Sequence, residues 1–362
     1  MFVSGNAAAN QLGIPVTTVV APLSPLLGRP GAVAGEGVDA GIAAHYGDPL
    51  REQRLLVEGL AVVDLSNRGV LTITGPDRLS WLHSITTQTL TGLTPHTSAE
   101  TLVLSPKGHI EHDLHLVDDG QTTWVTVEPG TTDALASWLD SMRFMLRVEV
   151  ADVSADYAVL GEPVRAETSP GEPLAWSDPW PLMVGDTAAY SAVVDPAGHP
   201  GSQRPWREVI VERARLEGAV GDRPLAGMWA AEALRVAVWR PRLGFETDQR
   251  TIPHEVDWLR TAVHLHKGCY RGQETVARVH NLGRPPRRLV FLHLDGSGHV
   301  LPERDAEVEV DGRVVGRLTS AALHYELGPI ALAVIKRNTP LDAVCLVAGL
   351  SASQEEIVRR DA

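Results

Sequence analysis

The sequence predicts an α+β fold in which two related halves, each built of strands and helices, are followed by a small all-β domain. The first observation is that short β-branched runs alternate twice with segments of helical periodicity over the first 286 of the 362 residues, a pattern typical of α+β cores. The second is a change in the sequence pattern after Pro285-Pro286, from mixed helical and strand-like segments to strand-like segments alone. Beyond it we expect only short strands as far as the last dozen residues, with a strong hairpin signal at Asp311-Gly312.

The elements of the first half follow from local composition. Residues 62–66 and 70–74 are rich in β-branched side chains, so we predict strands there. A helix is predicted after Gly75-Pro76-Asp77, because Pro suits the first helical position and Asp favours the N-terminal end. Residues 101–128 predict a three-strand meander, and a second helix is predicted from about residue 133, where apolar residues recur at helical spacing.

The second half is predicted to include a helix over residues 228–239 and a strand-like run at 261–265. Residues 161–181, rich in Pro, Glu and Gly, predict an exposed excursion. The predicted domain bounds are an extended lead-in at 1–40, a domain of two sub-domains at 41–286 with their boundary near 150–185, a small β domain at 287–350, and a tail at 351–362.

Composition excludes several classes of protein. The net charge of −13 disfavours non-specific binding to nucleic acid or anionic lipid. No stretch approaches the ~20 apolar residues that a membrane span needs, and residues 1–28 lack the basic residues of a signal peptide. The two cysteines, Cys269 and Cys345, cannot form a disulfide framework or a self-contained iron–sulfur site. We therefore expect a cytoplasmic protein with no stably bound metal.

One basic segment stands out in this acidic chain. Residues 267–288 hold six basic residues and one acidic residue, a local charge of +5. Such a segment favours a small anionic ligand. A solvated helix face followed by a basic loop explains the same charge, and charge alone leaves both interpretations open.

The densest candidate site is His266-Lys267-Gly268-Cys269-Tyr270-Arg271-Gly272-Gln273-Glu274, just before a helix predicted to start near Gln273. The two glycines indicate a tight turn whose backbone is open to a ligand. A cysteine close to a helix start and to two cations, Lys267 and Arg271, has surroundings that favour a thiolate. A buried, inert cysteine in a turn is the alternative. Cys345, in the apolar run 344–347, is predicted to fill the core.

Strand alternation over residues 109–116 provides a second candidate site. It places Asp113 and His115 on one face and His112 on the other. A carboxylate there can accept hydrogen bonds from a ligand, although a solvated strand face is the alternative. Because His109 and His115 lie on the face opposite His112, a three-histidine metal site is not expected.

The segment Lys267-Gly268-Cys269-Tyr270-x-Gly272-Gln273-Glu274, continued by Val276-Ala277-Arg278, resembles the signature of the YgfZ-type proteins, relatives of the glycine-cleavage T-protein (aminomethyltransferase). The resemblance covers roughly residues 45–350. It includes Glu232-Ala233-Leu234-Arg235 and Gly312-x-x-x-Gly316-x-x-Thr319-Ser320. It implies a folate-binding core around a central cavity, closed by a small β-barrel domain.

The resemblance implies a tetrahydrofolate-binding accessory protein for the assembly or repair of iron–sulfur enzymes. Its expected partners are a folate, with or without a polyglutamate tail, and iron–sulfur client or assembly proteins; a membrane or a nucleic acid is not expected. A T-protein-like aminomethyl or one-carbon transferase is the alternative, although the Lys-Gly-Cys-Tyr stretch departs from the T-protein's Lys-x-Asp-Phe-like residues. A protein associated with tRNA modification is a second alternative, so whether the chain is an enzyme stays open.

The resemblance also implies roles for single residues. Cys269 and Lys267 are the expected functional pair, and Asp113 falls where T-proteins place the acid that contacts the pterin. Arg235 is expected either to point into the folate cavity or to form a surface ion pair with Glu232. The remaining expected folate contacts are Gly268, Tyr270, Gly272, Gln273, Glu274 and Arg278.

Overall fold

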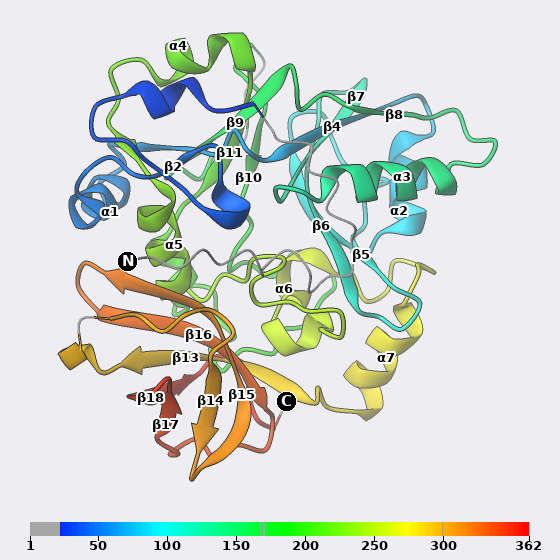
Figure 1. The fold of residues 1–362 in the computed structure, drawn as a ribbon. Helices are drawn as coiled ribbons and strands as arrows, with labels where there is room; N and C mark the ends of the chain where they lie inside the picture. The colour runs from blue at the N-terminus through cyan, green and yellow to red at the C-terminus, as the bar shows by residue number, and fades with distance from the viewer. Residues whose placement is uncertain (1–21, 167, 169–170, 299, 362) are drawn as a thin grey trace.

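Two five-stranded sheets and a closed six-stranded barrel form the framework of the described chain. The structure is a computed structural model that describes residues 22–166, 168, 171–298 and 300–361. The two sheets lie next to each other, and the barrel lies below them (Figure 1). None of the helices in these residues is long and apolar enough to cross a membrane.

The first sheet has the strand order β5-β6-β7-β4-β8 and is antiparallel throughout. Its strands are β4 (Gly69–Thr74), β5 (Ser98–Leu104), β6 (Ile110–Asp118), β7 (Thr122–Val127) and β8 (Glu149–Asp152). The helices α2 (Arg78–Ile85) and α3 (Thr132–Met142) pack against it through buried residues such as Leu82 and Leu135. The predicted meander and both predicted helices are therefore confirmed, because their turn and periodicity signals are local.

The second sheet has the order β10-β11-β9-β3-β12. Its strands are β3 (Val62–Asp64), β9 (Tyr157–Glu162), β10 (Ala175–Ser177), β11 (Arg207–Glu212) and β12 (Leu225–Ala226). The helices of this half are α1 (Pro49–Val57), α4 (Leu216–Val220) and α5 (Met228–Ala237). Since β3 precedes the whole first sheet in sequence but pairs with β9 and β12, the two halves are interleaved.

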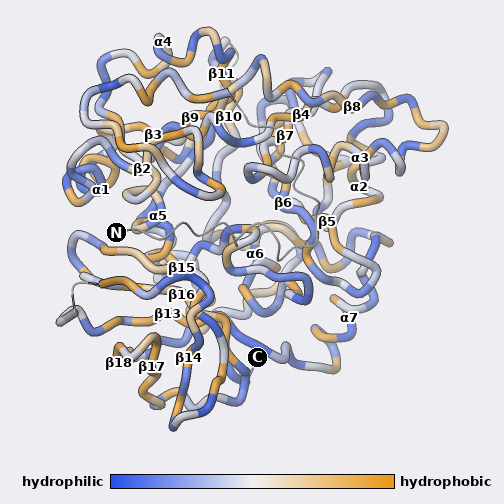
Figure 2. The backbone as a smooth tube through the Cα atoms, viewed as in Figure 1, coloured by the Kyte–Doolittle hydropathy of each residue, from blue (hydrophilic) through white to orange (hydrophobic). Residues whose placement is uncertain are grey.

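The barrel closes in the order β13-β16-β15-β14-β17-β18. Its strands are β13 (Arg287–Leu294), β14 (Glu307–Val310), β15 (Arg313–His324), β16 (Gly328–Lys336), β17 (Cys345–Val347) and β18 (Leu350–Glu356). The predicted hairpin joins β14 to β15, and Cys345 is fully buried as predicted. Figure 2 shows hydrophobic stretches along the barrel strands, as expected for a packed interior.

The predicted tail at 351–362 is wrong over its described part. β18 pairs with both β13 and β17. This pairing leaves no open edge in the barrel, and an unpaired edge would present free backbone groups. Residues 350–356 therefore complete the barrel.

Three further expectations differ from the structure. Residues 1–21 of the predicted lead-in lie outside the described residues. Most of 22–40 is exposed or half-buried, but Leu26 is fully buried, and β1 (Val33–Ala34) pairs with β2 (Ala43–His45). The run at 261–265, predicted to be strand-like, forms no strand, and its first two residues end a helix, α6 (Leu259–Ala262). The excursion at 161–181 contains β10 and the buried Trp176 and Trp180, because its aromatic residues outweigh the turn-forming ones around them.

Short 3₁₀ turns connect these elements at Pro25–Gly28, Gly37–Asp39, Pro200–Gln203, Arg213–Arg215, Pro253–Val256 and Gly296–Gly298. The last helix of the core, α7 (Gln273–Leu282), begins where the sequence predicts it. It leads through Gly283 into β13 and thus connects the core to the barrel (Figure 1).

Candidate functional site

A polar cavity lies where the two sheets meet α5. The space between its walls, including the part open to solvent, amounts to about 510 Å³, of which about 50 Å³ can hold the centre of a water-sized molecule. Five arginines line it: Arg68, Arg204, Arg235, Arg240 and Arg242. Five carboxylates line it as well: Asp113, Glu128, Asp178, Glu208 and Glu232. His115, Trp176 and Trp206 complete its main walls.

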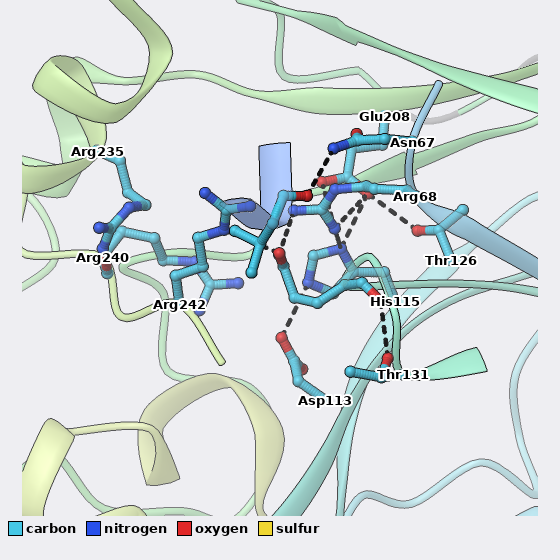
Figure 3. A network of polar contacts seen from close by, with 12 residues as sticks. Asn67, Arg68, Asp113, His115, Thr126, Thr131, Glu208, Arg235, Arg240 and Arg242 are labelled. Carbon is cyan, nitrogen blue, oxygen red and sulfur yellow. Dashed lines mark hydrogen bonds and ion pairs between the residues drawn. The ribbon is translucent and has the colours of Figure 1, made fainter. Parts of the chain in front are cut away.

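His115 lines this cavity and contacts two of its carboxylates. Alternation along β6 brings Asp113 and His115 to one face, as predicted, but the face is buried and not solvated. Nε2 of His115 lies 3.2 Å from Oδ2 of Asp113, and Nδ1 lies 3.0 Å from Oε2 of Glu208 (Figure 3). Burial lowers the pKa of His115, but Glu208 and Asp113 outweigh it and raise that pKa to about 10. The ring is therefore an imidazolium that donates from both nitrogens.

Arg68 and Trp176 hold this imidazolium in place. The guanidinium of Arg68 reaches Glu128 at 2.6 Å and Glu208 at 3.3 Å, and Figure 3 shows it beside the His115 ring. Thr126 donates a further hydrogen bond to Glu208 at 2.9 Å. Burial alone would raise the pKa of Glu208. Arg68, His115 and the hydrogen bond from Thr126 outweigh burial and hold this pKa well below its usual range. The carboxylate of Glu208 is thus kept ionised beside the cavity.

The segment after α5 contributes two more arginines. Arg242 donates to Asp39 and Glu128, both at 2.8 Å. Arg240 donates to Glu100 at 2.6 Å and to Asp178 at 3.2 Å. Each guanidinium therefore links two segments of the core that are far apart in the sequence.

The sequence offered two alternatives for Arg235, a place in the cavity or an ion pair with Glu232, and the structure shows elements of both. It pairs with Glu232 at 2.9 Å, but Arg235 itself is buried and lines the cavity, while Glu232 is partly exposed. Its guanidinium also donates to Glu246 at 2.8 Å and to Ser320 of β15 at 2.7 Å. Arg235 therefore connects the cavity wall to the barrel.

Several polar atoms around the cavity are buried and have no hydrogen-bond partner among the described residues. They are Oδ1 of Asp113, Oε2 of Glu100, Nη1 of Arg240 and Nε of Arg204. Arg204 also stacks over Trp206 with its guanidinium carbon 4.1 Å from the ring centroid. Burial lowers the pKa of Arg204 to about 10 despite Asp178 nearby. Buried polar groups are normally satisfied, so this set points to a ligand with both donors and acceptors.

Glu100, Asp113 and His115 each offer one atom to a common point, and these atoms lie within 4.8 Å of one another. That spacing alone would suit a metal ion. However, both ring nitrogens of His115 already lie within hydrogen-bond distance of carboxylates, Nε2 near Asp113 and Nδ1 near Glu208, so a metal would have to replace one of these contacts. The arrangement therefore favours an organic ligand over a cation.

The predicted Lys267–Gly272 segment lies between α6 and α7, and none of its residues lines the cavity. The ammonium of Lys267 donates to the backbone carbonyls of His83 and Thr86 at the end of α2, and burial lowers its pKa to about 8. Arg271 pairs with Glu111 at 2.9 Å. Cys269 is exposed, but the two cations expected to face it are bound to other groups.

The other predicted ligand contacts in this segment do not line the cavity either. Tyr270 is buried, and the Lys267 ammonium lies 5.2 Å from its ring centroid. Gly268 and Gly272 have positive φ, and Gln273 is the first residue of α7. Glu274 and Arg278 are exposed on α7. A folate role for these residues stays a prediction.

The basic segment at 267–288 is largely neutralised or buried. Besides Lys267 and Arg271, Arg287 pairs with Asp248 and Glu255, and Arg288 is fully buried. Only Arg278 and Arg284 of the six basic residues are exposed. The segment therefore offers little of the positive surface that its composition indicates.

Sequence reasoning missed much of the cavity wall. Trp176 lies in the stretch interpreted as an excursion, and Glu208 sits inside an ordinary strand pattern. Arg240 and Arg242 flank Pro241 in a connection with no periodicity. The pattern Arg-Pro-Arg next to a helix end was the one available signal, and it does not by itself indicate burial.

Comparison with known proteins identifies the fold. Residues 28–161 match the GCVT N-terminal domain. The chain is 25% identical over 338 residues to the aminomethyltransferase of Moorella thermoacetica, covering 87% of this chain and 90% of that protein. It is 26% identical over 303 residues to a chloroplastic protein of Arabidopsis thaliana named as a candidate transferase, covering 75% of this chain but only 65% of that protein.

A solved structure, the glycine cleavage system aminomethyltransferase T from Bartonella henselae, superposes with a TM-score of 0.68 at 17% identity. It covers 92% of this chain and 94% of that one. The predicted fold class is thereby confirmed, while the YgfZ-type assignment stays a prediction. The chain has the aminomethyltransferase T fold.

Proposed function

We propose that this chain binds a reduced folate in the cavity between its sheets, with Asp113 accepting hydrogen bonds from the pterin ring. The observation that carries the proposal is Oδ1 of Asp113, which is buried in the cavity wall without a partner. Leaving such an acceptor unmet costs about 1–3 kcal/mol. The pterin ring offers N–H and NH₂ groups that can meet it.

The remaining walls suit the other parts of a folate. Trp176 and Met228 provide apolar surface, and the unpartnered nitrogens of Arg204 and Arg240 are donors for carboxylates of the glutamate tail. Arg235 is committed to Glu232 and Glu246, so its role is to position the wall. When bound, a reduced folate supplies a carrier for a one-carbon unit.

For the physiological role, we propose an accessory protein for the assembly or repair of iron–sulfur enzymes. Its support is the resemblance of Lys267–Glu274 to the YgfZ-type signature and the exposure of Cys269, which leaves the thiol within reach of a partner. Aminomethyl or one-carbon transfer is the alternative, and the names of the bacterial relatives favour it. Association with tRNA modification has less support, because the basic segment is mostly paired. A cytoplasmic location stays a prediction.

The folate site is tested by titrating the purified protein with tetrahydrofolate and its methylene and formyl forms. Asp113→Asn should weaken binding about 10- to 100-fold, because a hydrogen bond to a charged group contributes about 1.5–3 kcal/mol. Asp222→Asn is the matched control, since Asp222 is exposed outside the cavity. Unchanged affinity in Asp113→Asn would remove Asp113 from the site, and no binding at millimolar folate would refute the folate proposal.

The physiological role is tested in cells that lack the protein and are complemented with variants. Cys269→Ser should lower the activity of iron–sulfur enzymes while the abundance of the variant protein stays normal. Normal iron–sulfur activity with Cys269→Ser, combined with folate-dependent release of a one-carbon unit from an aminomethyl donor in vitro, would instead support the transferase role.

A further inference from the structure

The first strand of the barrel carries a buried arginine near its beginning. Arg288 is the second residue of β13 and is 0% exposed. It lies on the same strand face as Val290 and Leu292, which pack inside the barrel in one cluster with Cys345. The guanidinium of Arg288 therefore lies at one end of an apolar interior.

All hydrogen bonds of this guanidinium go to neutral oxygens. Nη2 donates to the carbonyl of Thr339 at 3.1 Å and to Oε1 of Gln354 at 2.9 Å, and Nε donates to the carbonyl of Arg337 at 3.4 Å. Nη1 is buried and has no partner among the described residues. The hydroxyl of Thr339, a residue that is 5% exposed, has no partner there either. Two neighbouring residues thus leave two buried polar groups unmet.

Arg288 differs from the other buried arginines in its charge environment. Four further arginines of the described chain are buried, and each has a carboxylate oxygen at 2.6 or 2.8 Å: Arg235, Arg240, Arg242 and Arg260. Among the same described residues, no carboxylate lies within ion-pair distance of Arg288. Buried charges are normally paired, so the other four arginines follow the rule and Arg288 departs from it.

The acid that acts on Arg288 from further away does not replace such a partner. Glu356 of β18 lies beyond ion-pair distance, and its carboxylate accepts from the backbone nitrogen of Arg360 at 2.6 Å. Burial lowers the pKa of Arg288 more than Glu356 raises it, and Arg360 acts in the same direction as burial. An arginine nevertheless stays protonated at neutral pH. This end of the barrel therefore holds a positive charge without a close counterion in the described chain.

The hydrogen bonds and the charge together select the class of ligand. A water molecule would satisfy the two polar groups, but it would leave the charge uncompensated in an apolar interior, which is costly. A phosphate has several oxygens that each accept strong hydrogen bonds, whereas only two groups are unmet here. We infer that Nη1 of Arg288 and the hydroxyl of Thr339 bind a small monovalent anion of the halide class, chloride being the probe of choice.

The anion ties together three segments of the barrel. Arg288 belongs to β13 and Thr339 to the connection between β16 and β17, while Gln354 of β18 contacts both Arg288 and that connection through the carbonyls of Pro340 and Ala343. These segments come together only in the folded barrel. Anion binding therefore stabilises the folded state, and it does so whether or not the cavity binds a folate.

The site is tested by thermal unfolding of the full chain in chloride-free gluconate buffer, with chloride added at constant ionic strength. Chloride should raise the midpoint of unfolding by about 2 °C or more and then saturate. Arg288→Met should abolish this rise. In chloride-free buffer, this variant should unfold at the same or a higher temperature than the wild type, because apolar surface replaces an uncompensated charge.

Two further variants separate the site from general effects of salt. Arg313→Met removes an exposed arginine of β15 and should keep the wild-type response to chloride. Thr339→Val keeps the charge of Arg288 but removes one hydrogen bond, so the chloride concentration that gives half of the response should rise about five- to tenfold. This variant also keeps the inference testable if Arg288→Met does not fold.

A direct test uses crystals grown with bromide in place of chloride. Bromide should give an anomalous peak within hydrogen-bond distance of Nη1 of Arg288 and the hydroxyl of Thr339. Either of two results would overturn the inference. One is the absence of this peak, and the other is a response to chloride that is as large in Arg288→Met as in the wild type.

Discussion

The rings of His115 and Trp176 stack face to face, with centroids 3.6 Å apart and planes 4° apart. His115 lies on β6 of the first sheet and Trp176 on β10 of the second. Since His115 is charged, the contact is a buried interaction between a cation and an aromatic face. It joins the two sheets at the wall of the candidate site, and it makes stability and site geometry depend on the same residues.

Trp176→Ala should therefore destabilise the protein strongly. A fully buried Trp replaced by Ala costs about 3–5 kcal/mol, from lost burial and the cavity left behind. Urea unfolding measures the loss. Trp229→Ala is the matched control, because Trp229 is 58% exposed and surface changes usually stay within about 0.5 kcal/mol. Equal effects of the two changes would contradict the role given to the stack.

His115 should make stability depend on pH in a defined direction. The folded-state pKa of His115 is about 10, above the ordinary value of about 6.5, so its contribution is complete below pH 6.5 and is lost as the pH rises towards 10. The free energy of unfolding should fall by up to about 1.4 kcal/mol per pH unit above pH 6.5 from this group. His115→Gln should remove that part of the slope.

Lys267 acts in the opposite direction at higher pH. Its folded-state pKa of about 8 is below the ordinary value of 10.5, so the unfolded chain binds more protons between these values and stability from this group rises with pH. From pH 6.5 to 8, buried histidines with lowered pKa values, such as His112, His199 and His254, also contribute to the slope. The contribution of His115 in this window is therefore the difference between the wild type and His115→Gln. A slope that is identical in the wild type and in His115→Gln within this window would show that the imidazole is neutral.

The two cysteines should differ sharply in accessibility. Cys269 is exposed and Cys345 is fully buried in the barrel. One thiol of the folded protein should react readily with a thiol-directed reagent, and Cys269→Ser should abolish this reaction. Cys345 should react only when the barrel opens or denaturant is added. Rapid labelling of Cys345 in folded Cys269→Ser would contradict the closed barrel.

Gly272 should tolerate substitution less well than Gly268. Both have positive φ, so Ala at either position is strained. A Cβ at Gly272 would also lie 2.5 Å from the carbonyl oxygen of Ser105 and 3.0 Å from Cα of Gly108, whereas a Cβ at Gly268 would meet nothing within 4 Å. Gly272→Ala should therefore cost about 1–3 kcal/mol more than Gly268→Ala.

The same comparison tests whether the 267–272 segment supports the cavity. Gly272 contacts the turn between β5 and β6, the strands that carry Glu100 and Asp113. If this contact positions the strands, Gly272→Ala should weaken folate binding while Gly268→Ala does not. Equal folate affinity in the two variants would separate the segment from the cavity.

The local architecture could be predicted from the sequence because its signals are local. The Asp311-Gly312 hairpin, the helix α5 and the meander of β5 to β7 each follow from turn residues or apolar spacing within a few positions. Alternation along β6 likewise placed Asp113 and His115 on one face. The strand β18 was missed because its alternating polar residues pack on only one side of a barrel.

The sequence by itself thus determined the meander of β5 to β7, the hairpin between β14 and β15, and the placement of Asp113 and His115 on one strand face. Only the tertiary structure decided what that face meets: Glu208 lies 93 residues further along the chain from His115, and Trp176 lies in a stretch that composition marks as exposed. It also decided that Lys267 binds the end of α2 and that Arg271 pairs with Glu111, so that both cations are bound away from Cys269. The physical reason is that periodicity reports which side of an element is buried, whereas the partner on that side depends on how distant strands are brought together.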